Sequence, residues 1–379
     1  MSSPSKKAGG KRGKKVRVSF RPNRSTKRRV TDWTRKIRDS GDQELDTDHS
    51  ESVSAKGELS RRRTIIEFEP GDVVDPDLRL GTVIAVRGLF ADVDEGTQIW
   101  SCTVRRVLRT RTIKDRHPVT VGDRVRFRVG PNQQGVEREG VIEAVEPRHG
   151  ELKRRVRNRI HTIVANVDQA IVVSSARQPH PKPHLIDRYL VAAGVGEITP
   201  VICMNKIDLD EDGMARDILA QYAQLGYDTV CTSIVDGEGI EELCDLLRNK
   251  ENVFAGQSGV GKSSLLNVIQ PGLGLKVGKI VDHTDKGRHT TTTACLIRLE
   301  MGGYVVDTPG VKSFDLSAVG RHEIEAHFIE FLDHIPHCKF PDCGHTHEIG
   351  CAVKGAVERG EIRIERYNSY IRLFEESAS

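Results

Sequence analysis

The sequence has no apolar run that approaches the roughly 18 consecutive residues of a membrane span, and 30% of its residues are charged. It also lacks the N-terminal apolar core that defines a secretory signal. Without an export signal, its eight cysteines are expected to be reduced thiols rather than disulfides. These absences predict a soluble cytoplasmic protein that does not enter a membrane.

The net charge of +4 hides an uneven distribution along the chain. Residues 1–63 contain 19 Lys and Arg against 8 Asp and Glu, a net of +11, so the rest of the chain carries −7. This basic tail has few apolar residues to offset the entropy of ordering and is predicted to be disordered. It is either a solvated tail that aids solubility or an electrostatic arm for nucleic acid.

The length of 379 residues suggests two or three domains. Residues 64–150 hold about five short runs rich in Val, Ile and Phe, separated by Gly, Asp and Pro. This pattern predicts a five-stranded β-barrel of the oligonucleotide-binding (OB) type. Alternation in one run places Arg124, Arg126 and Arg128 on one face, which is either an RNA-binding surface or an ordinary solvated face.

Residues 151–316 are predicted to form an α/β domain after a basic connector at 153–159. Apolar runs that are typical of strands alternate with helical stretches, which indicates a mostly parallel sheet with helices on both faces. Strands are expected at 163–167, 170–173, 200–204, 228–232 and 252–255, and helices at 185–193, 214–225 and 240–247. Residues 317–379 are expected to form a mainly helical domain that contains a cysteine cluster.

The strongest motif is a phosphate-binding loop of pattern GxxxxGK[ST], placed between a predicted strand and a predicted helix. Its glycines let backbone N–H groups wrap phosphates, Lys262 reaches the outer phosphates, and Ser263 offers a hydroxyl to Mg²⁺. The candidate phosphate-binding residues are Gly256, Gln257, Ser258, Gly259, Val260, Gly261, Lys262, Ser263 and Ser264.

An NKxD motif, Asn205, Lys206, Ile207 and Asp208, directly follows a predicted buried strand. The carboxylate of Asp208 can accept hydrogen bonds from N1–H and from the exocyclic amine of guanine, two donors that adenine does not present together. Beside a phosphate-binding loop, this motif therefore favours GTP over ATP.

Two further segments are candidate switches. Asp307 begins an Asp-Thr-Pro-Gly motif that can hold Mg²⁺ through water, and the N–H of Gly310 can sense the γ-phosphate. Residues 287–293 read Gly-Arg-His-Thr-Thr-Thr-Thr, either a mobile loop with a hydroxyl for Mg²⁺ or a strand edge. The NKxD motif precedes the phosphate loop, whereas it comes late in ordinary small GTPases, so the order predicts a circularly permuted domain.

A cysteine cluster lies in the C-terminal segment. Cys338, Cys343 and Cys351 fall within 14 residues, together with His345 and His347. Three thiolates and one imidazole suffice for a closed, structural zinc site. The spacing leaves open which histidine is the fourth ligand, and the alternative is a group of free thiols.

In combination, these motifs resemble the RsgA/YjeQ family of small-ribosomal-subunit biogenesis GTPases over residues 70–376. The resemblance implies an OB-type barrel, a permuted GTPase domain and a zinc-bearing C-terminal domain. It also implies that the four zinc ligands are Cys338, Cys343, His345 and Cys351. The signature segments are 165–169, 185–190, 256–264, 287–292, 343–345 and 350–353.

The resemblance further implies that Thr291 and Thr292 belong to the nucleotide site and that Ser233 packs beside guanine, although Ile234 replaces the usual alanine after it. Ras-like enzymes orient water with a glutamine at the position of Val311, and valine cannot do so. We therefore expect slow intrinsic hydrolysis that a partner accelerates. The resemblance indicates His289 as the water-positioning residue; otherwise His289 is a solvent-facing loop histidine.

These observations predict a monomeric, Mg²⁺-dependent GTP hydrolase that binds GTP and GDP, holds one structural zinc, and docks on the small ribosomal subunit and its rRNA. It would act in late subunit maturation and leave after hydrolysis. One alternative is an rRNA-binding structural factor for which guanine nucleotide is a passive ligand. Another is a translation-factor-like GTPase that acts on assembled ribosomes.

Overall fold

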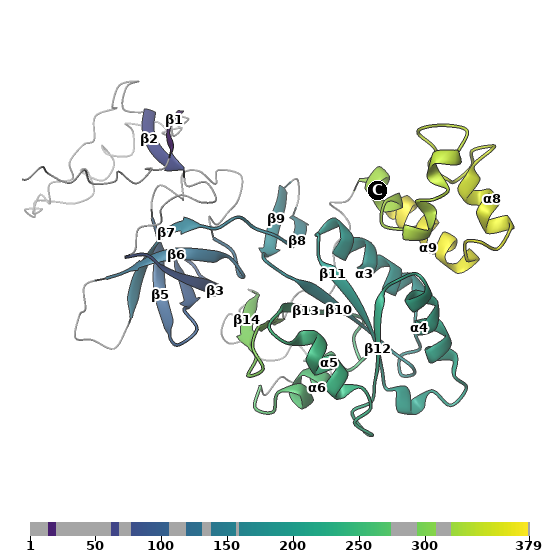
Figure 1. The fold of residues 1–379 in the computed structure, drawn as a ribbon, viewed down its shortest axis with the longest axis horizontal. Coiled ribbons are helices and arrows are strands. Elements are labelled where there is room, and N and C mark those ends of the chain that lie inside the picture. Colours follow the sequence, from purple (N-terminus) through teal and green to yellow (C-terminus); the bar gives the residue numbers. More distant parts are fainter. Residues whose placement is uncertain are drawn as a thin grey trace, which may run out of the picture. The chain divides into compact units, whose positions relative to one another are not determined.

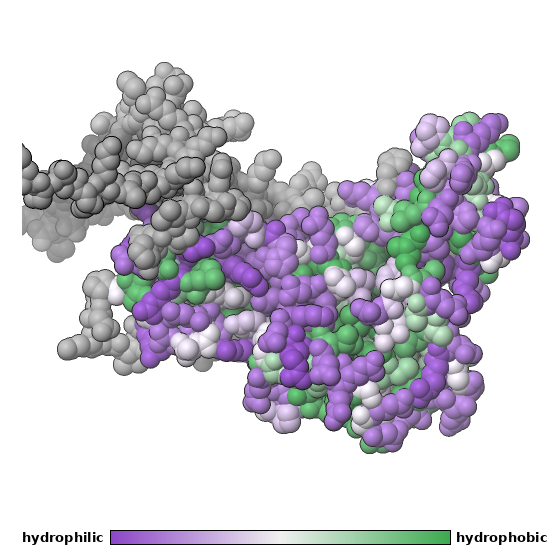
Figure 2. Space-filling model, viewed as in Figure 1, coloured by the Kyte–Doolittle hydropathy of each residue, from purple (hydrophilic) through white to green (hydrophobic). Residues whose placement is uncertain are grey.

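A computed structural model of the chain describes residues 14–19, 62–67, 77–105, 119–130, 138–156, 159–273, 294–307 and 320–377. The chain divides into two units, Met1–Pro76 and Asp77–Ser379 (Figure 1). On the face drawn in Figure 2, hydrophobic residues of the second unit lie in several separate areas among hydrophilic ones. None of the helices in the described ranges has the length and apolar character that a bilayer crossing requires.

The first unit contains a short antiparallel pair, β1 (Lys14–Ser19) and β2 (Arg62–Glu67). The prediction of a disordered tail did not anticipate this pairing, because each strand is short and the two lie far apart in the sequence. The other residues of the 1–63 tail lie outside the described residues, so its disorder stays a prediction.

A closed five-stranded barrel begins the second unit, as the sequence predicted. Its order is β3-β4-β5-β7-β6, and β5 runs parallel to β7 while the other neighbours are antiparallel. Val83, Phe127 and Ile142 are fully buried in its centre. The strands are β3 (Arg79–Arg87), β4 (Phe90–Asp94), β5 (Ile99–Val104), β6 (Arg124–Val129) and β7 (Glu139–Val145).

The predicted arginine face of the barrel lies on β6, and acidic side chains pair with part of it. Arg126 contacts Glu146, and the Arg128 guanidinium lies 3.6 Å from a carboxylate oxygen of Glu143. The face is therefore a mixture of charges rather than a uniformly positive surface, which weakens a purely electrostatic RNA-binding interpretation.

The basic stretch predicted as a connector is a β-hairpin. Strand β8 (Leu152–Val156) pairs antiparallel with β9 (Arg159–Val164). The density of Lys and Arg concealed the strand pattern, because charged residues alternate there with few apolar ones. The strand expected at 163–167 therefore ends at Val164, and it belongs to this hairpin.

A six-stranded sheet forms the centre of the second unit, with the order β12-β11-β10-β13-β15-β14. All neighbouring pairs are parallel except β14 with β15, which confirms the predicted mostly parallel sheet. The strands are β10 (Gln169–Ser175), β11 (Thr199–Asn205), β12 (Asp228–Thr232), β13 (Glu251–Ala255), β14 (Cys295–Arg298) and β15 (Tyr304–Asp307).

Helices cover both faces of this sheet, and each layer encloses its own apolar core. Leu190 and Ile202 belong to one core, and Val201, Leu243 and Leu265 belong to the other. All seven residues of β10 are buried, as expected for a central parallel strand that is covered on both faces. The helices are α3 (Pro183–Val195), η2 (Ile207–Leu209), α4 (Met214–Gln224), α5 (Ile240–Leu247) and α6 (Lys262–Ile269).

The C-terminal segment is helical, as predicted, and is organised around aromatic rings. Phe331 and Tyr370 are fully buried, and their ring centroids are 5.1 Å apart. Its elements are α7 (Arg321–Glu325), η4 (Ile329–Phe331), η5 (Ile335–His337), α8 (Ala352–Glu358) and α9 (Ile364–Glu376).

A buried charge cluster joins α9 to the central domain. Arg366 is only 6% exposed, and it pairs with Asp187 of α3 at 2.5 Å and with Glu330 at 2.6 Å. The hydroxyl of Tyr222 also donates to Asp187, at 2.7 Å. Because removing one partner of such a pair leaves an uncompensated buried charge, the cluster fixes how α9 lies on α3.

Glu251, at the start of β13, makes the stability of the fold depend on pH. Its side chain is buried, and its Oε2 has no hydrogen-bond partner among the described residues. Burial, with a smaller contribution from nearby Asp168, raises the pKa of Glu251 to about 7, although Arg124 opposes the shift. Because the folded pKa exceeds the unfolded value, the folded state holds a proton that the unfolded state releases at lower pH. The stabilisation is complete below about pH 4.5 and is lost as the pH rises through about 7.

The free energy of unfolding of Glu251→Gln is therefore expected to exceed that of the unmodified chain by on the order of 2 kcal/mol at pH 8. At pH 5 the two free energies should differ little. Urea unfolding monitored between pH 5 and 8 measures this. Glu241→Gln, an exposed position on α5, is the control and should leave the pH profile unchanged. A profile for Glu251→Gln that parallels that of the unmodified chain would contradict the assignment.

Candidate functional site

The phosphate loop connects β13 to α6 and is packed too closely for any residue but glycine at two positions. Gly256 has φ of 142°, and a Cβ there would lie 2.1 Å from the carbonyl oxygen of Val173. Gly261 has φ of 100°, and a Cβ there would lie 2.4 Å from Nδ2 of Asn205. Both glycines therefore keep the loop pressed against the ends of β10 and β11.

Lys262, the first residue of α6, folds back over the loop. Its Nζ donates to the carbonyl oxygens of Gly256 at 2.7 Å and Gln257 at 3.0 Å. Burial lowers the pKa of the Lys262 ammonium group, because a charged group is costly away from water. A bound phosphate would supply the opposite charge that this position favours.

The NKxD motif is clamped onto the phosphate loop, although it lies about 50 residues earlier in the chain. Asn205 Nδ2 donates to the carbonyl oxygen of Val260 at 2.8 Å, and Lys206 Nζ donates to that of Gly259 at 2.8 Å. Lys206 adopts a left-handed backbone conformation, with φ of 60°, which turns the chain sharply after β11. The structure therefore brings these two sequence motifs together into one site.

Asp208 is held in place by Ser233, which follows β12. The Ser233 hydroxyl donates to Asp208 Oδ1 at 2.8 Å and accepts a hydrogen bond from the Asp236 N–H at 3.2 Å. Ser233 is fully buried, and Ile234 packs against the apolar core beneath the sheet. Ser233 therefore holds the carboxylate of Asp208, the group that the sequence predicts to bind guanine.

Ser233→Ala should weaken GDP binding about tenfold, because a hydrogen bond to a charged group contributes about 1.5 kcal/mol and the freed carboxylate must then be ordered by guanine itself. Titration with a fluorescent GDP analogue measures the effect. Ser369→Ala, an equally buried serine on α9, is the matched control. Equal affinities for the two variants would show that Ser233 does not orient Asp208.

Several predicted switch residues lie outside the described residues, namely His289, Thr291, Thr292 and Gly310. Asp307 is the last residue of β15, and its backbone pairs with that of Cys295 at the start of β14. The β14–β15 hairpin therefore brings together the chain positions that lead into the two switch motifs. The assignments for these residues stay predictions.

Tyr189 on α3 is a contact to the phosphate loop that sequence analysis missed. The N–H of Gly256 donates a hydrogen bond to its hydroxyl, and burial, the larger influence, raises the pKa of Tyr189. The segment 185–190 is predicted to be helical and to match a family signature, and nothing in its periodicity indicates a partner 67 positions away. Beside it, a small pocket is lined by Val172, Val173, Ser174, His180, Lys182, Leu185, Ile186, Tyr189, Gln257 and Val260.

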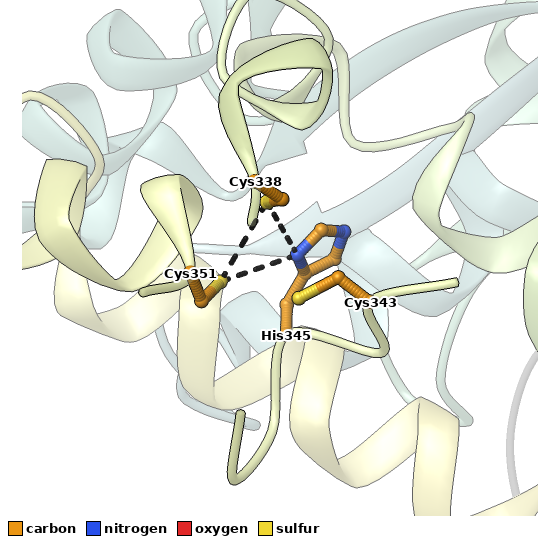
Figure 3. Close-up of side chains that lie close together, drawn as sticks. All are labelled: Cys338, Cys343, His345 and Cys351. Carbon is orange, nitrogen blue, oxygen red and sulfur yellow. Dashed lines mark hydrogen bonds between the residues drawn. The ribbon is translucent and has the colours of Figure 1, made fainter. Parts of the chain in front are cut away.

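The structure also brings the cysteine cluster together (Figure 3). The potential ligand atoms of Cys338, Cys343, His345 and Cys351 all lie within 4.8 Å of one another. The sulfur atoms of Cys338 and Cys351 are 3.9 Å apart, close to the roughly 3.8 Å edge of a tetrahedron with Zn–S bonds of about 2.3 Å. His345 points Nδ1 at these sulfurs, at 3.6 and 3.3 Å, whereas His347 is exposed.

The chemistry of this donor set fits a divalent cation. Burial, together with the neighbouring thiols of Cys351 and Cys338, raises the pKa of the Cys343 thiol to about 12. Three thiols so close together therefore need a cation before they ionise. Glu325 lies 3.2 Å from His345 Nε2 and Tyr367 donates to the His345 carbonyl at 2.7 Å, which orients the imidazole as expected around a metal.

The chain is similar in sequence to a family of known proteins. The family model described as RsgA GTPase matches residues 145–317. A protein of Chlorobaculum tepidum named small ribosomal subunit biogenesis GTPase RsgA is 44% identical over 267 residues, which is 69% of this chain and 86% of that protein. The protein of the same name from Shewanella oneidensis is 39% identical over 339 residues, 84% of this chain and 93% of that protein.

Two solved structures are similar in both sequence and fold. YjeQ from Thermotoga maritima is 38% identical, with a TM-score of 0.65, and the match covers 80% of this chain and 99% of that chain. YloQ, described as a circularly permuted GTPase, is 33% identical with a TM-score of 0.62, and the match covers 79% and 95% of the two chains. The predicted combination of a barrel, a permuted α/β domain and a helical C-terminal domain is thereby confirmed.

Proposed function

The chain belongs to the RsgA family and is a GTP hydrolase, and from this premise we propose that it binds the small ribosomal subunit during late maturation and hydrolyses GTP in response. The names of the relatives from Chlorobaculum and Shewanella support the link to this subunit. We infer further that it acts as a monomer in the cytoplasm, a location that fits the link of these relatives to ribosome biogenesis.

The observation that carries the nucleotide assignment is the clamp between the NKxD motif and the phosphate loop. The hydrogen bonds from Asn205 to Val260 and from Lys206 to Gly259 fix the base-recognition motif at a set distance from the phosphate site. Ser233 orients Asp208 before any ligand arrives. Preorganised polar groups of this kind discriminate strongly against a base that cannot satisfy them.

The chain's own residues account for most of the proposed chemistry. The backbone N–H groups of the phosphate loop and Lys262 would hold the phosphates and stabilise charge that develops on them. The Ser263 hydroxyl would be an oxygen ligand for Mg²⁺ and Asp307 would hold the ion through water; when bound, the ion neutralises phosphate charge. Since Val311 cannot orient water, we propose that His289 positions the attacking water, with a partner needed to hold it there.

Subunit binding is the most direct test of the proposed partner. Cosedimentation of the full chain with purified small subunits should be strong with a non-hydrolysable GTP analogue and at least tenfold weaker with GDP. Large subunits are the control and should not retain the protein. Equal retention with both nucleotides would contradict release after hydrolysis, and retention by both subunits equally would contradict specificity for the small one.

The basic tail provides a second, electrostatic test of the same proposal. A chain that starts at Asp77, the first residue of the second unit, lacks the tail charges. If the tail contacts rRNA, the dependence of binding on salt concentration becomes shallower for this shorter chain, because fewer counterions are released. An unchanged slope would assign the tail no part in docking.

A further inference from the structure

The β14–β15 hairpin has two ends with different neighbours. At one end Cys295 pairs with Asp307, and at the other Arg298 pairs with Tyr304. The two ends are three residue steps apart along each strand, a span of about 10 Å. The threonine-rich motif leads into the Cys295 end, and the Asp-Thr-Pro-Gly motif continues from Asp307. Any movement of this short, paired hairpin therefore moves the adjoining ends of both motifs.

The opposite end of the hairpin contacts the barrel around a buried carboxylate. The Tyr304 hydroxyl donates to Asp94 Oδ2 at 2.8 Å, and Arg298 Nη1 lies 3.8 Å from the same oxygen. Arg298 also donates to the carbonyl oxygen of Gly96. Asp94 is the last residue of β4 and is only 7% exposed. A single barrel residue thus meets both strands of the hairpin.

The barrel side of this contact is held firmly. The other carboxylate oxygen of Asp94 accepts the Gly96 N–H at 2.7 Å. In the same turn, Glu95 accepts hydrogen bonds from the Trp100 indole at 2.8 Å and from Arg79 at 3.1 Å. Hydrogen bonds within this turn and to the barrel strands therefore hold Asp94 in place. A displacement of the barrel would move its carboxylate and so reach the hairpin.

The hairpin side is tied to the strand that enters the phosphate loop. Tyr304 N–H donates to the Lys250 carbonyl at 3.0 Å, and Asn252 Nδ2 donates to the Tyr304 carbonyl at 3.2 Å. Burial, with a further contribution from Asp94, raises the pKa of the Tyr304 hydroxyl, so the hydroxyl remains a hydrogen-bond donor at physiological pH. Tyr304 is the point where barrel, hairpin and phosphate strand meet.

We propose that Asp94 is a positioning residue for the GTPase reaction. Through Tyr304 and Arg298 it fixes the position of the β14–β15 hairpin, so that binding of the barrel to a partner changes the rate of GTP hydrolysis. The inference rests on the proposed function, because the partner is the small ribosomal subunit. Coupling between two binding equilibria is reciprocal. If subunit binding changes the affinity for the nucleotide through this contact, the bound nucleotide changes the affinity for the subunit by the same factor.

Tyr304→Phe tests this by removing one hydroxyl. Its turnover without subunits should stay within twofold of the unmodified chain, while the stimulation by small subunits should fall about tenfold. The ratio of subunit affinities with a GTP analogue and with GDP should fall by a similar factor. Tyr222→Phe is the matched control, because its hydroxyl also donates to a buried carboxylate, Asp187, at 2.7 Å. It should keep full stimulation.

Asp94→Asn is a second variant that keeps a hydrogen-bonding group beside Tyr304 but removes the charge that faces Arg298; it should lose part of the stimulation. Full stimulation of Tyr304→Phe, or equal losses in Tyr304→Phe and Tyr222→Phe, would overturn the inference while the proposed function stood. No stimulation of the unmodified chain would overturn the proposed function, and the inference with it. Thermal melting of each variant excludes loss of the fold as the cause.

Discussion

Gly256→Ala is expected to lower the affinity for GDP and GTP by at least a hundredfold. The added Cβ would lie 2.1 Å from the carbonyl oxygen of Val173 and 3.1 Å from its carbon, and both belong to the backbone of β10. The φ of 142° is also one that alanine rarely adopts, and such strain costs about 1–3 kcal/mol by itself. The loop must therefore move away from β10, which separates its N–H groups from the phosphates.

Calorimetric titration with GDP measures this loss, and thermal melting establishes that the variant is folded. Gly272→Ala is the control, since Gly272 has φ of 103° but no atom within 4 Å of an added Cβ. It introduces a similar backbone strain without the overlap and should bind GDP normally. If the affinity of Gly256→Ala for GDP were within threefold of that of the unmodified chain, the close packing of the loop against β10 would not determine the shape of the site.

Removing the metal is expected to unpack the helical domain while leaving the nucleotide site intact. Zinc-finger peptides gain about 10–16 kcal/mol of apparent binding energy from their ion, and we expect this segment to depend on a bound ion in a similar way. His345 packs against Phe331 and Tyr370, with ring centroids 6.1 and 6.0 Å away. Cys351 also caps α8, because its sulfur accepts the Lys354 N–H at 3.4 Å.

We expect the purified protein to contain one zinc ion, and chelation to abolish the near-ultraviolet circular dichroism of the aromatic cluster. GDP affinity should change by less than threefold, because none of the described nucleotide contacts comes from the helical domain. Cys343→Ser should reproduce the effect, whereas Cys244→Ser, a half-buried cysteine on α5, should not. A protein that contains no zinc, or whose dichroism withstands complete chelation, would contradict a structural metal site.

Local patterns of residues predicted much of this molecule. The phosphate loop and the NKxD motif are short, and each encodes its own turn, so the spacing of Gly256, Lys262 and Asp208 already indicated where they lie. Alternating apolar runs located the barrel strands, and the helix at Ile240–Leu247 has the predicted bounds. In each case the information lies within a few neighbouring residues, where propensity and periodicity act.

Contacts between distant segments could not be predicted in this way. Arg366 resembles any exposed helix residue in sequence, and only folding reveals that Asp187 and Glu330 enclose it. Asp94 and Tyr304 are 210 positions apart, so no periodicity links them. The β8–β9 hairpin was interpreted as a connector because its basic residues concealed a pairing that depends on the partner strand. Tertiary packing decides such cases.

The central claim is that this chain is a guanine-nucleotide hydrolase whose turnover responds to the small ribosomal subunit. Phosphate release from GTP by the full chain, measured alone, with purified small subunits and with large subunits, tests it most directly. We predict slow turnover alone, at least a tenfold increase with small subunits, and none with large ones, with ATP inert throughout. Equal turnover with and without small subunits would contradict the account and favour an rRNA-binding factor for which the nucleotide is a passive ligand.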